Sequence, residues 1–281
     1  MSRIEAYYYT DPACPWSWAL EPSLRRLIAE LGEALHVRYV MAGMAREFGA
    51  PDELARAALE AGLASGMPVD PRIWWENPPR SSYPACIAVI AAAEQGDPSA
   101  YLRRLREGLL CRRRKLDTTE ALIEEARAVP GLDVERLRID LGSHAMLEAF
   151  GADLERSRAV DERHHAPGAG RVKLPSLEFR GGGGAVHGVY GPAGFDELMA
   201  AAVAAGAGGA AGAPAAAAAP GAGAPASLEE ALRRWGTMAT VEVAEVCRLP
   251  GPRAPAELWR AAMEWRVVAE RLGTGELWSL A

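Results

Sequence analysis

The sequence of 281 residues predicts an α/β fold with an inserted helical subdomain, and three patterns carry this prediction. Residues 4–40 have the pattern of a strand, a helix and a second strand. Residues 51–163 show helical periodicity and no strand signal, whereas residues 174–190 have the pattern of a hairpin. Because the helical region is too long for a simple crossover, we predict that it is inserted into the sheet-forming unit.

The first forty residues predict a β-α-β unit. Ile4–Tyr9 is rich in aromatic residues and is predicted to be a strand, and apolar residues then recur at helical spacing from Pro15 to Leu31. Gly32 is a plausible helix stop, and 35–40 alternates as a second strand. Such a unit implies two parallel strands joined by a right-handed crossover.

The middle of the chain predicts a series of helices with recognisable starts. Prolines suit the first turn of a helix, and the sequence Asp117-Thr118-Thr119-Glu120 resembles a helix cap. The predicted helices begin at Pro51 and then cover Pro84–Gly96, Pro98–Leu110, Asp133–Leu141 and His144–Arg163.

The sheet pattern returns at Leu174–Phe179 and Ala185–Tyr190. Gly181–Gly184 lies between these strands and is predicted to be a hairpin turn, because no helix follows that could make it a phosphate loop. Pro192–Ala204 is predicted to be a closing helix. We therefore place the first domain at residues 1–204, with its helical insertion at about 51–163.

A linker and a small second unit follow. Residues 205–226 consist only of Ala, Gly and Pro, and a flexible coil of that length spans on the order of 25 Å. Ser227-Leu228-Glu229-Glu230 forms a capping box. Three short helices and a terminal hairpin are predicted over 227–281, which is the order of elements in a winged-helix domain. We expect this unit to dock on the first domain or on a protein partner.

Composition excludes several classes of function. The net charge is −6, and residues 226–281 hold seven Arg, no Lys and eight Glu, so no nucleic-acid partner is predicted. No apolar run reaches the roughly 18–20 residues of a membrane helix, and the chain enters a strand directly after Met1-Ser2-Arg3. We therefore expect a cytoplasmic protein that makes no membrane contact.

Cys14 is the residue most indicative of function. It follows the first predicted strand and precedes Pro15, which suits the first position of a helix. A helix N-terminus offers free N–H groups and a partial positive charge, and both favour a thiolate. The sequence therefore predicts a reactive Cys14 with a thiol pKa below its ordinary value.

The turn Cys14-Pro15-Trp16-Ser17 and the pair Leu174-Pro175 resemble the DsbA-like branch of the thioredoxin-like proteins. Asp11-Pro12-Ala13 and Ser82-Tyr83-Pro84-Ala85 extend the resemblance to the FrnE-like oxidoreductases. The resemblance implies a thioredoxin-like fold over about residues 3–204. It also implies a nucleophilic Cys14, a substrate-binding surface of Pro15, Trp16, Leu174 and Pro175, and a cis bond before Pro175.

The resemblance departs from the dithiol members at Ser17, where they carry a second cysteine. Release of a mixed disulfide needs a second thiol, so the implied chemistry is that of a single nucleophile, Cys14, with Ser17 beside it. The implied function is a thiol-disulfide oxidoreductase that uses glutathione or another low-molecular-weight thiol and has no tightly bound cofactor. Its partner would be a thiol or disulfide substrate, either a small molecule or a protein.

Two alternatives stay open. The motif is also similar to the kappa-class glutathione transferases and the 2-hydroxychromene-2-carboxylate isomerases, which place a hydroxyl residue at the position of Cys14. The third reading is a redox-inactive adaptor that binds protein through the same groove. The sequence leaves the substrate undetermined and is compatible with a homodimer.

Other candidate residues have simpler explanations. Cys86 and Cys247 are predicted to be core residues, and Cys111 is predicted to end a solvated basic helix. His164 and His165 have no partners at metal-ligand spacing, so no metal site is predicted. Trp74-Trp75 lies in a proline-rich loop that packs on the domain or walls a substrate groove.

Overall fold

A four-stranded sheet forms the centre of the first domain in the computed structural model, which describes residues 3–207, 225 and 227–281. Its strand order is β2-β1-β3-β4, and β1 pairs in parallel with β2 and antiparallel with β3. The predicted parallel pair and the predicted β3–β4 hairpin are therefore confirmed. The strands are β1 (Ile4–Thr10), β2 (Leu35–Met41), β3 (Ser176–Arg180) and β4 (Val186–Tyr190).

The predicted helix over Pro15–Leu31 is two helices. α1 (Pro15–Ala19) ends at Leu20, and α2 (Glu21–Leu31) begins directly after it. Pro22 explains the break, because its ring has no N–H to donate to the preceding turn. The break leaves Cys14 at the start of a helix of only five residues.

The helical insertion packs around its own core. α5 is apolar on nearly all sides, and buried residues of α5, α6, α7 and α9 form one cluster with Met41 at the end of β2. The helix predicted over His144–Arg163 ends earlier, at Arg158, and a short 3₁₀ turn follows at Glu162–His164. The helices of the insertion are α3 (Pro51–Ser65), α4 (Ile73–Glu76), α5 (Tyr83–Ala93), α6 (Ser99–Leu110), α7 (Thr119–Ala126), α8 (Val134–Leu141) and α9 (His144–Arg158).

The second unit has the predicted order of three helices and a hairpin. A short strand, β5, pairs with the last strand and gives a three-stranded sheet of order β5-β7-β6. Most of the predicted linker, 208–224 and 226, lies outside the described residues, and the division into domains stays a prediction. The elements after β4 are α10 (Phe195–Ala204), α11 (Leu228–Trp235), β5 (Met238–Ala239), α12 (Thr240–Val246), α13 (Arg253–Met263), β6 (Val267–Leu272) and β7 (Gly275–Leu280).

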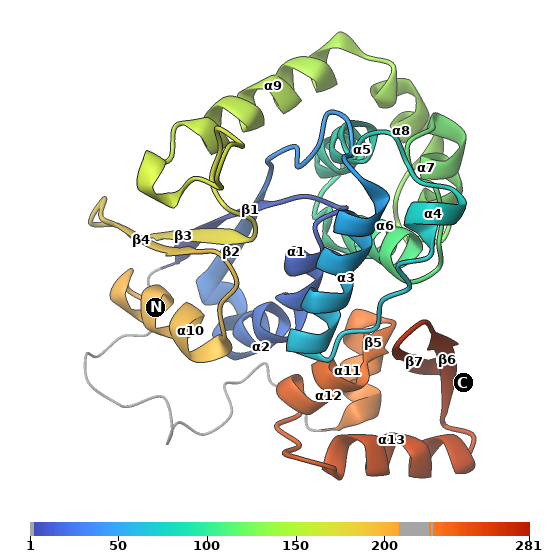
Figure 1. Cartoon of the computed structure of the whole chain (residues 1–281). Helices are drawn as coiled ribbons and strands as arrows, with labels where there is room; N and C mark the ends of the chain where they lie inside the picture. Colours follow the sequence, from blue (N-terminus) through green and yellow to red (C-terminus); the bar gives the residue numbers. More distant parts are fainter. Residues whose placement is uncertain (1–2, 208–224, 226) are drawn as a thin grey trace.

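This unit docks on the first domain, below α2 and α3 in Figure 1. Both carboxylate oxygens of the fully buried Glu242 accept hydrogen bonds from Arg103 at 2.7 and 2.9 Å. Arg25 reaches the same carboxylate at 3.2 Å. At the tip of the β6–β7 hairpin, Thr274 and Val69 exchange two hydrogen bonds of 3.0 Å. The hairpin tip therefore contacts the chain itself.

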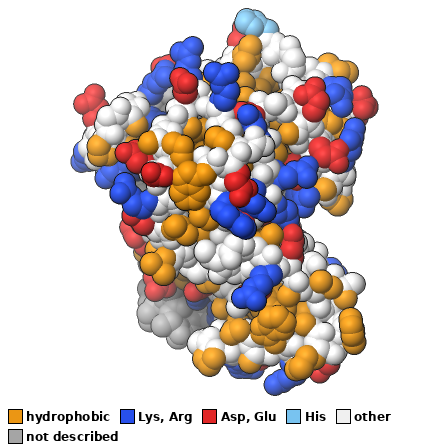
Figure 2. Space-filling model, turned by 45° about the vertical axis from the view of Figure 1, so that its right-hand side comes forward, with side chains coloured by type: hydrophobic (Ala, Val, Ile, Leu, Met, Phe, Trp, Pro, Cys, Tyr) orange, Lys and Arg blue, Asp and Glu red, His pale blue; other side chains and the backbone are white. Residues whose placement is uncertain are grey.

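Apolar side chains gather on the outer surface of the second unit, in the lower part of Figure 2. Trp265 is 86 % exposed and has a left-handed backbone with φ of 57°. Trp259, Met263 and Val268 are also at least half exposed.

The predicted homodimer stays a prediction. Among the described residues, no helix combines the length and apolarity that a membrane span requires.

Candidate functional site

The turn after β1 holds Cys14 in a fixed geometry. The Cys14 N–H donates to the Asp11 carbonyl at 3.2 Å, and the Ser17 N–H donates to Cys14 Sγ at 3.4 Å. Cys14 is thus the N-cap of α1, with Pro15 in the first turn, as the sequence predicts.

The predicted lowering of the Cys14 thiol pKa is wrong for the chain by itself. Cys14 is only 3 % exposed, and burial raises its thiol pKa above the ordinary value. The hydrogen bonds from Ser17 and the charge of Arg106 act in the opposite direction, but they do not overcome desolvation. A helix of five residues also has a weak dipole, so the position of Cys14 at its N-terminus lowers the thiol pKa only slightly.

Ser17 lies beneath Cys14 and is completely buried. Its hydroxyl makes no hydrogen bond of ordinary geometry within the described part of the chain, although it is near enough to lower the thiol pKa of Cys14. The structure therefore brings Cys14 and Ser17 together. Their predicted catalytic roles stay predictions.

Asp11 organises the turn, and the sequence analysis did not assign it a role. Its buried carboxylate accepts hydrogen bonds from the Ala13 N–H at 2.8 Å, the Met44 N–H at 2.5 Å and the Ser82 hydroxyl at 2.7 Å. Cys86 also donates to it, at 3.2 Å. The separated motifs around Asp11 and Ser82 are thus in direct contact, and their joint presence in the resemblance was the only signal.

A cavity of about 210 Å³ opens beside Cys14. Its wall is almost entirely apolar and comes from the turn, from α3 and from the loops around Met44 and Leu174. Trp74 lines this cavity and also packs in the core of the insertion against Phe48, so the role of the Trp74-Trp75 pair in substrate binding stays a prediction. Trp75 is half exposed and donates to Asp52. The lining residues are Ala13, Cys14, Pro15, Trp16, Met44, Leu54, Ala57, Ala58, Trp74, Leu110, Ala166, Arg171 and Leu174.

The loop before β3 forms the facing wall. The Leu174–Pro175 peptide bond is cis, and Leu174 lines the same cavity as Cys14, Pro15 and Trp16. Arg171 joins two loops at the rim, because its guanidinium donates to the Met44 and Val172 carbonyls at 3.1 Å. Three of the predicted substrate-binding residues, Pro15, Trp16 and Leu174, therefore line one cavity, whereas Pro175 follows Leu174 in the chain and does not line it.

A buried cation lies close to the turn that holds Cys14. Arg106 on α6 is 0 % exposed and donates to Glu21, to Thr10 Oγ1 and, at 3.4 Å, to the Tyr8 hydroxyl. The Tyr8 hydroxyl in turn donates to the Ser17 carbonyl at 3.3 Å. Arg106 on α6 is therefore connected to Glu21 of α2 and, through the Tyr8 hydroxyl, to the Ser17 carbonyl of the turn. No sequence motif indicated this role.

Of the other cysteines, Cys86 is a core residue as predicted, whereas Cys247 is only partly buried against the core of the second unit. Cys86 and Cys111 are fully buried, and burial raises the pKa of both thiols. Cys111 donates to the Pro68 carbonyl and packs against Trp18, so the predicted solvated end of its helix is wrong at this residue. Burial raises the pKa of Cys247 to about 11. All four cysteines are free.

The basic and histidine runs are paired with neighbours. Arg112 bonds to Glu107 and Glu270, which ties the end of α6 to β6. His164 stacks on Tyr190 with ring centroids 3.7 Å apart. Within the described residues, no three side chains of metal-ligating type come together.

The fold and the turn define a class. A sequence profile of the thioredoxin family matches residues 7–165, more than half of the chain, and the chain belongs to this family. Its fold is that of the DsbA-like oxidoreductases, as the resemblance predicted. A putative protein disulfide isomerase from Nitrosomonas europaea superposes with a TM-score of 0.60 at 15 % identity, covering 72 % of this chain and 97 % of that protein. The cytosolic disulfide reductase DsbM from Pseudomonas aeruginosa gives 0.53 at 19 % identity, covering 66 % and 88 %.

The curated proteins of similar sequence are named as adapter proteins and not as oxidoreductases. The ClpXP adapter protein SpxH of Halalkalibacterium halodurans is 31 % identical over 170 residues, which are 56 % of this chain and 55 % of that protein. The chain thus spans about half the length of the curated relatives it matches.

Proposed function

We propose that this protein is a protein-binding adaptor that holds a segment of a partner polypeptide in the cavity beside Cys14. The observation that carries the proposal is the apolar wall of that cavity, with a buried Cys14 at its base. A volume of about 210 Å³ with such a wall suits a large apolar side chain of a protein. Among the described residues that line the cavity, Arg171 is the one charged side chain that could pair with the charged groups of glutathione.

Two further facts support an adaptor. The turn holds a single cysteine with Ser17 at the position of a second, and burial raises the thiol pKa of Cys14. Both reduce the rate of disulfide exchange. The relatives at about 30 % identity are named ClpXP adapters, and we extend the proposal to delivery of the bound protein to ClpXP.

The test fills the cavity without changing Cys14. Ala57 lines it from α3, so Ala57→Trp should block binding of the partner, whereas Glu60→Trp on the exposed side of the same helix should not. In cells that lack the native gene, pulse-labelled proteomics would identify proteins whose half-lives depend on the wild-type chain. Those half-lives should lengthen with Ala57→Trp and stay unchanged with Glu60→Trp and Cys14→Ser. Loss of the effect with Cys14→Ser would contradict a non-covalent adaptor.

The second candidate is the single-cysteine oxidoreductase, favoured by the position of Cys14 at a helix start on the wall of a cavity that Leu174 also lines. The Cys14 thiolate would attack a disulfide R–S–S–R, forming a Cys14–S–S–R bond and releasing RS⁻. Glutathione or another small thiol R′–SH would then attack the R sulfur of the mixed disulfide. This step regenerates the Cys14 thiol and releases the disulfide R′–S–S–R. Mass spectrometry after incubation with glutathione disulfide should detect one glutathionyl group on Cys14, and none in Cys14→Ser.

The transferase or isomerase alternative stays a prediction with its own test. Because related enzymes carry a hydroxyl at this position, Cys14→Ser should keep a conjugating activity with glutathione if that reading holds. Loss of a conjugating activity in this variant would exclude it.

A further inference from the structure

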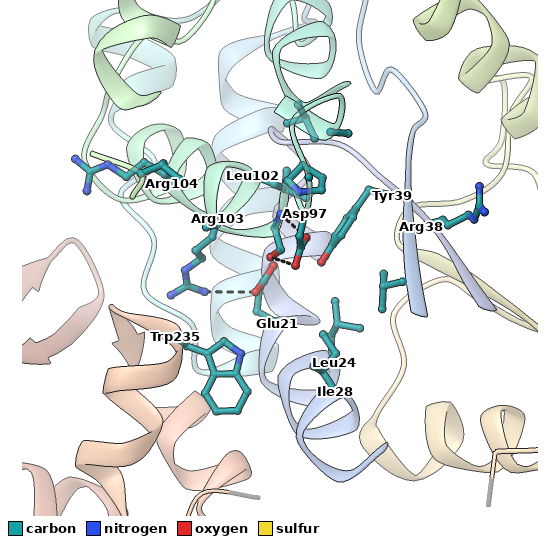
Figure 3. Close-up of a pocket in the computed structure, with 18 of the residues that line it drawn as sticks. Glu21, Leu24, Ile28, Arg38, Tyr39, Asp97, Leu102, Arg103, Arg104 and Trp235 are labelled. Atoms are coloured by element: carbon teal, nitrogen blue, oxygen red, sulfur yellow. Dashed lines mark hydrogen bonds and ion pairs between the residues drawn. The ribbon is translucent and has the colours of Figure 1, made fainter. Parts of the chain in front are cut away.

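A cleft of about 1280 Å³ follows the free edge of the central sheet and shares no lining residue with the cavity of Cys14. All residues of β2 line it, and β2 is an edge strand of the sheet. Figure 3 shows that α2, α6 and the end of α11 enclose the same space, with Tyr39 and Asp97 pointing into it. This volume exceeds that of ordinary small-molecule sites, which are roughly 300–1,000 Å³.

The backbone of β2 presents hydrogen-bonding groups to this cleft. The Ala42 N–H donates to the Thr10 carbonyl on β1. The backbone N–H and C=O groups of the even-numbered residues of β2 therefore point toward β1, and those of the odd-numbered residues point away from it, toward the cleft. The outward N–H of Met41 donates to Asp153 Oδ2 at 2.8 Å. The outward groups of Val37 and Tyr39 have no hydrogen-bond partner among the described residues.

We propose that this edge is a docking site for an extended segment of another polypeptide, which adds a fifth strand beside β2. An unpaired strand edge is a template for such pairing, since its N–H and C=O groups recur every second residue. Val37 and Tyr39 supply two successive outward positions, and the Asp153 bond to Met41 ends the free edge. The site therefore accepts backbone from an extended chain.

The two faces of β2 define the side chains of the partner. On one face Val37 and Tyr39 pack with Leu24 and Ile28 of α2, so apolar partner residues belong there. Asp97 also lines this side of the cleft and disfavours acidic ones, whereas the Glu21 carboxylate is already paired with arginines.

The other face of β2 carries two arginines, with Glu5 and Asp153 nearby. Arg38 and Arg156 both lie over the ring of Tyr7, at 6.0 and 5.2 Å from its centroid. Arg38 pairs with Glu5, whereas no carboxylate of the described residues is within ion-pair distance of Arg156. The partner segment therefore alternates apolar and acidic residues, with its acidic side chains beside Arg156.

The test uses a fluorescein-labelled eight-residue peptide of alternating Val and Glu and the full-length protein. Hydrogen exchange should show protection of the Val37 and Tyr39 amides on binding and no change around Cys14. Two control peptides carry N-methyl groups on all valines or on all glutamates. One of the two should lose binding, because its methyl groups replace the N–H donors that face β2.

Charge variants test the orientation of the peptide. Arg156→Glu should weaken binding about threefold to tenfold, and Arg158→Glu, an exposed neighbour on α9, should leave it unchanged. Equal binding of both N-methylated peptides, or binding without protection of Val37 and Tyr39, would overturn the proposal. Protection of both amides that rises with protein concentration in the absence of peptide would also overturn it, because the occupant would then be a second copy.

Discussion

The Ser82 hydroxyl donates a hydrogen bond of 2.7 Å to Asp11 Oδ2, and this bond joins α5 of the insertion to the turn that carries Cys14. The same carboxylate binds the N–H groups of Ala13 and Met44, so it links the turn to the loop after β2, and both segments line the cavity. The geometry of the site therefore depends on a residue of the insertion as well as on the turn.

Removal of the Ser82 hydroxyl should loosen this arrangement. Because the buried Asp11 carboxylate would lose a donor, Ser82→Ala should lower the free energy of unfolding by about 1–3 kcal/mol in urea denaturation. Ser279→Ala on β7, far from the turn, is the matched control and should cost less than about 0.5 kcal/mol. Equal effects of the two changes would show that the Asp11 bond contributes nothing specific.

Cys14 should react slowly at neutral pH. Because its thiol pKa is raised by burial, alkylation followed by peptide mass spectrometry should be slower in the native protein than in the urea-unfolded chain. The native rate should continue to rise above pH of about 8.5, where an ordinary cysteine levels off. A plateau at or below that pH would show that the thiol is activated after all.

The Glu242 carboxylate should be essential for docking of the second unit. Glu242→Gln leaves Arg25 and Arg103 as buried cations short of one negative charge, so we expect a loss of about 3–5 kcal/mol in the free energy of unfolding. Glu245→Gln is the control, since its partner Arg26 is partly exposed, and it should cost less than about 1 kcal/mol. Similar values for both would mean that the buried network adds no stability.

Asp153 should make stability depend on pH. Burial raises its pKa to about 6, above the unfolded value of about 3.9, so its contribution is fully present below pH 3.9 and is lost as the pH rises through 6. Asp153→Asn keeps an acceptor for the Met41 N–H and does not titrate. Relative to this variant, the wild type should lose about 2 kcal/mol of unfolding free energy between pH 4 and pH 7.5. Parallel pH curves would contradict the raised pKa.

The sequence by itself determined the elements and their order. Alternation in β1 and β2, prolines at helix starts and glycines in the hairpin act through local backbone preferences, which neighbouring residues decide. For this reason the parallel β1–β2 pair, the β3–β4 hairpin and the three helices of the second unit were all predicted. The position of Cys14 at a helix start was predicted in the same way.

Only the tertiary structure decided the environment of those residues. The pKa of Cys14 depends on how much protein covers its sulfur and on charges that are distant in the chain, such as that of Arg106. The roles of Asp11 and Ser82, of Glu242 and Arg103, and of the free edge of β2 likewise arise between segments that only folding brings together. Local pattern fixes which backbone forms, whereas desolvation and long-range contact fix what a side chain can do.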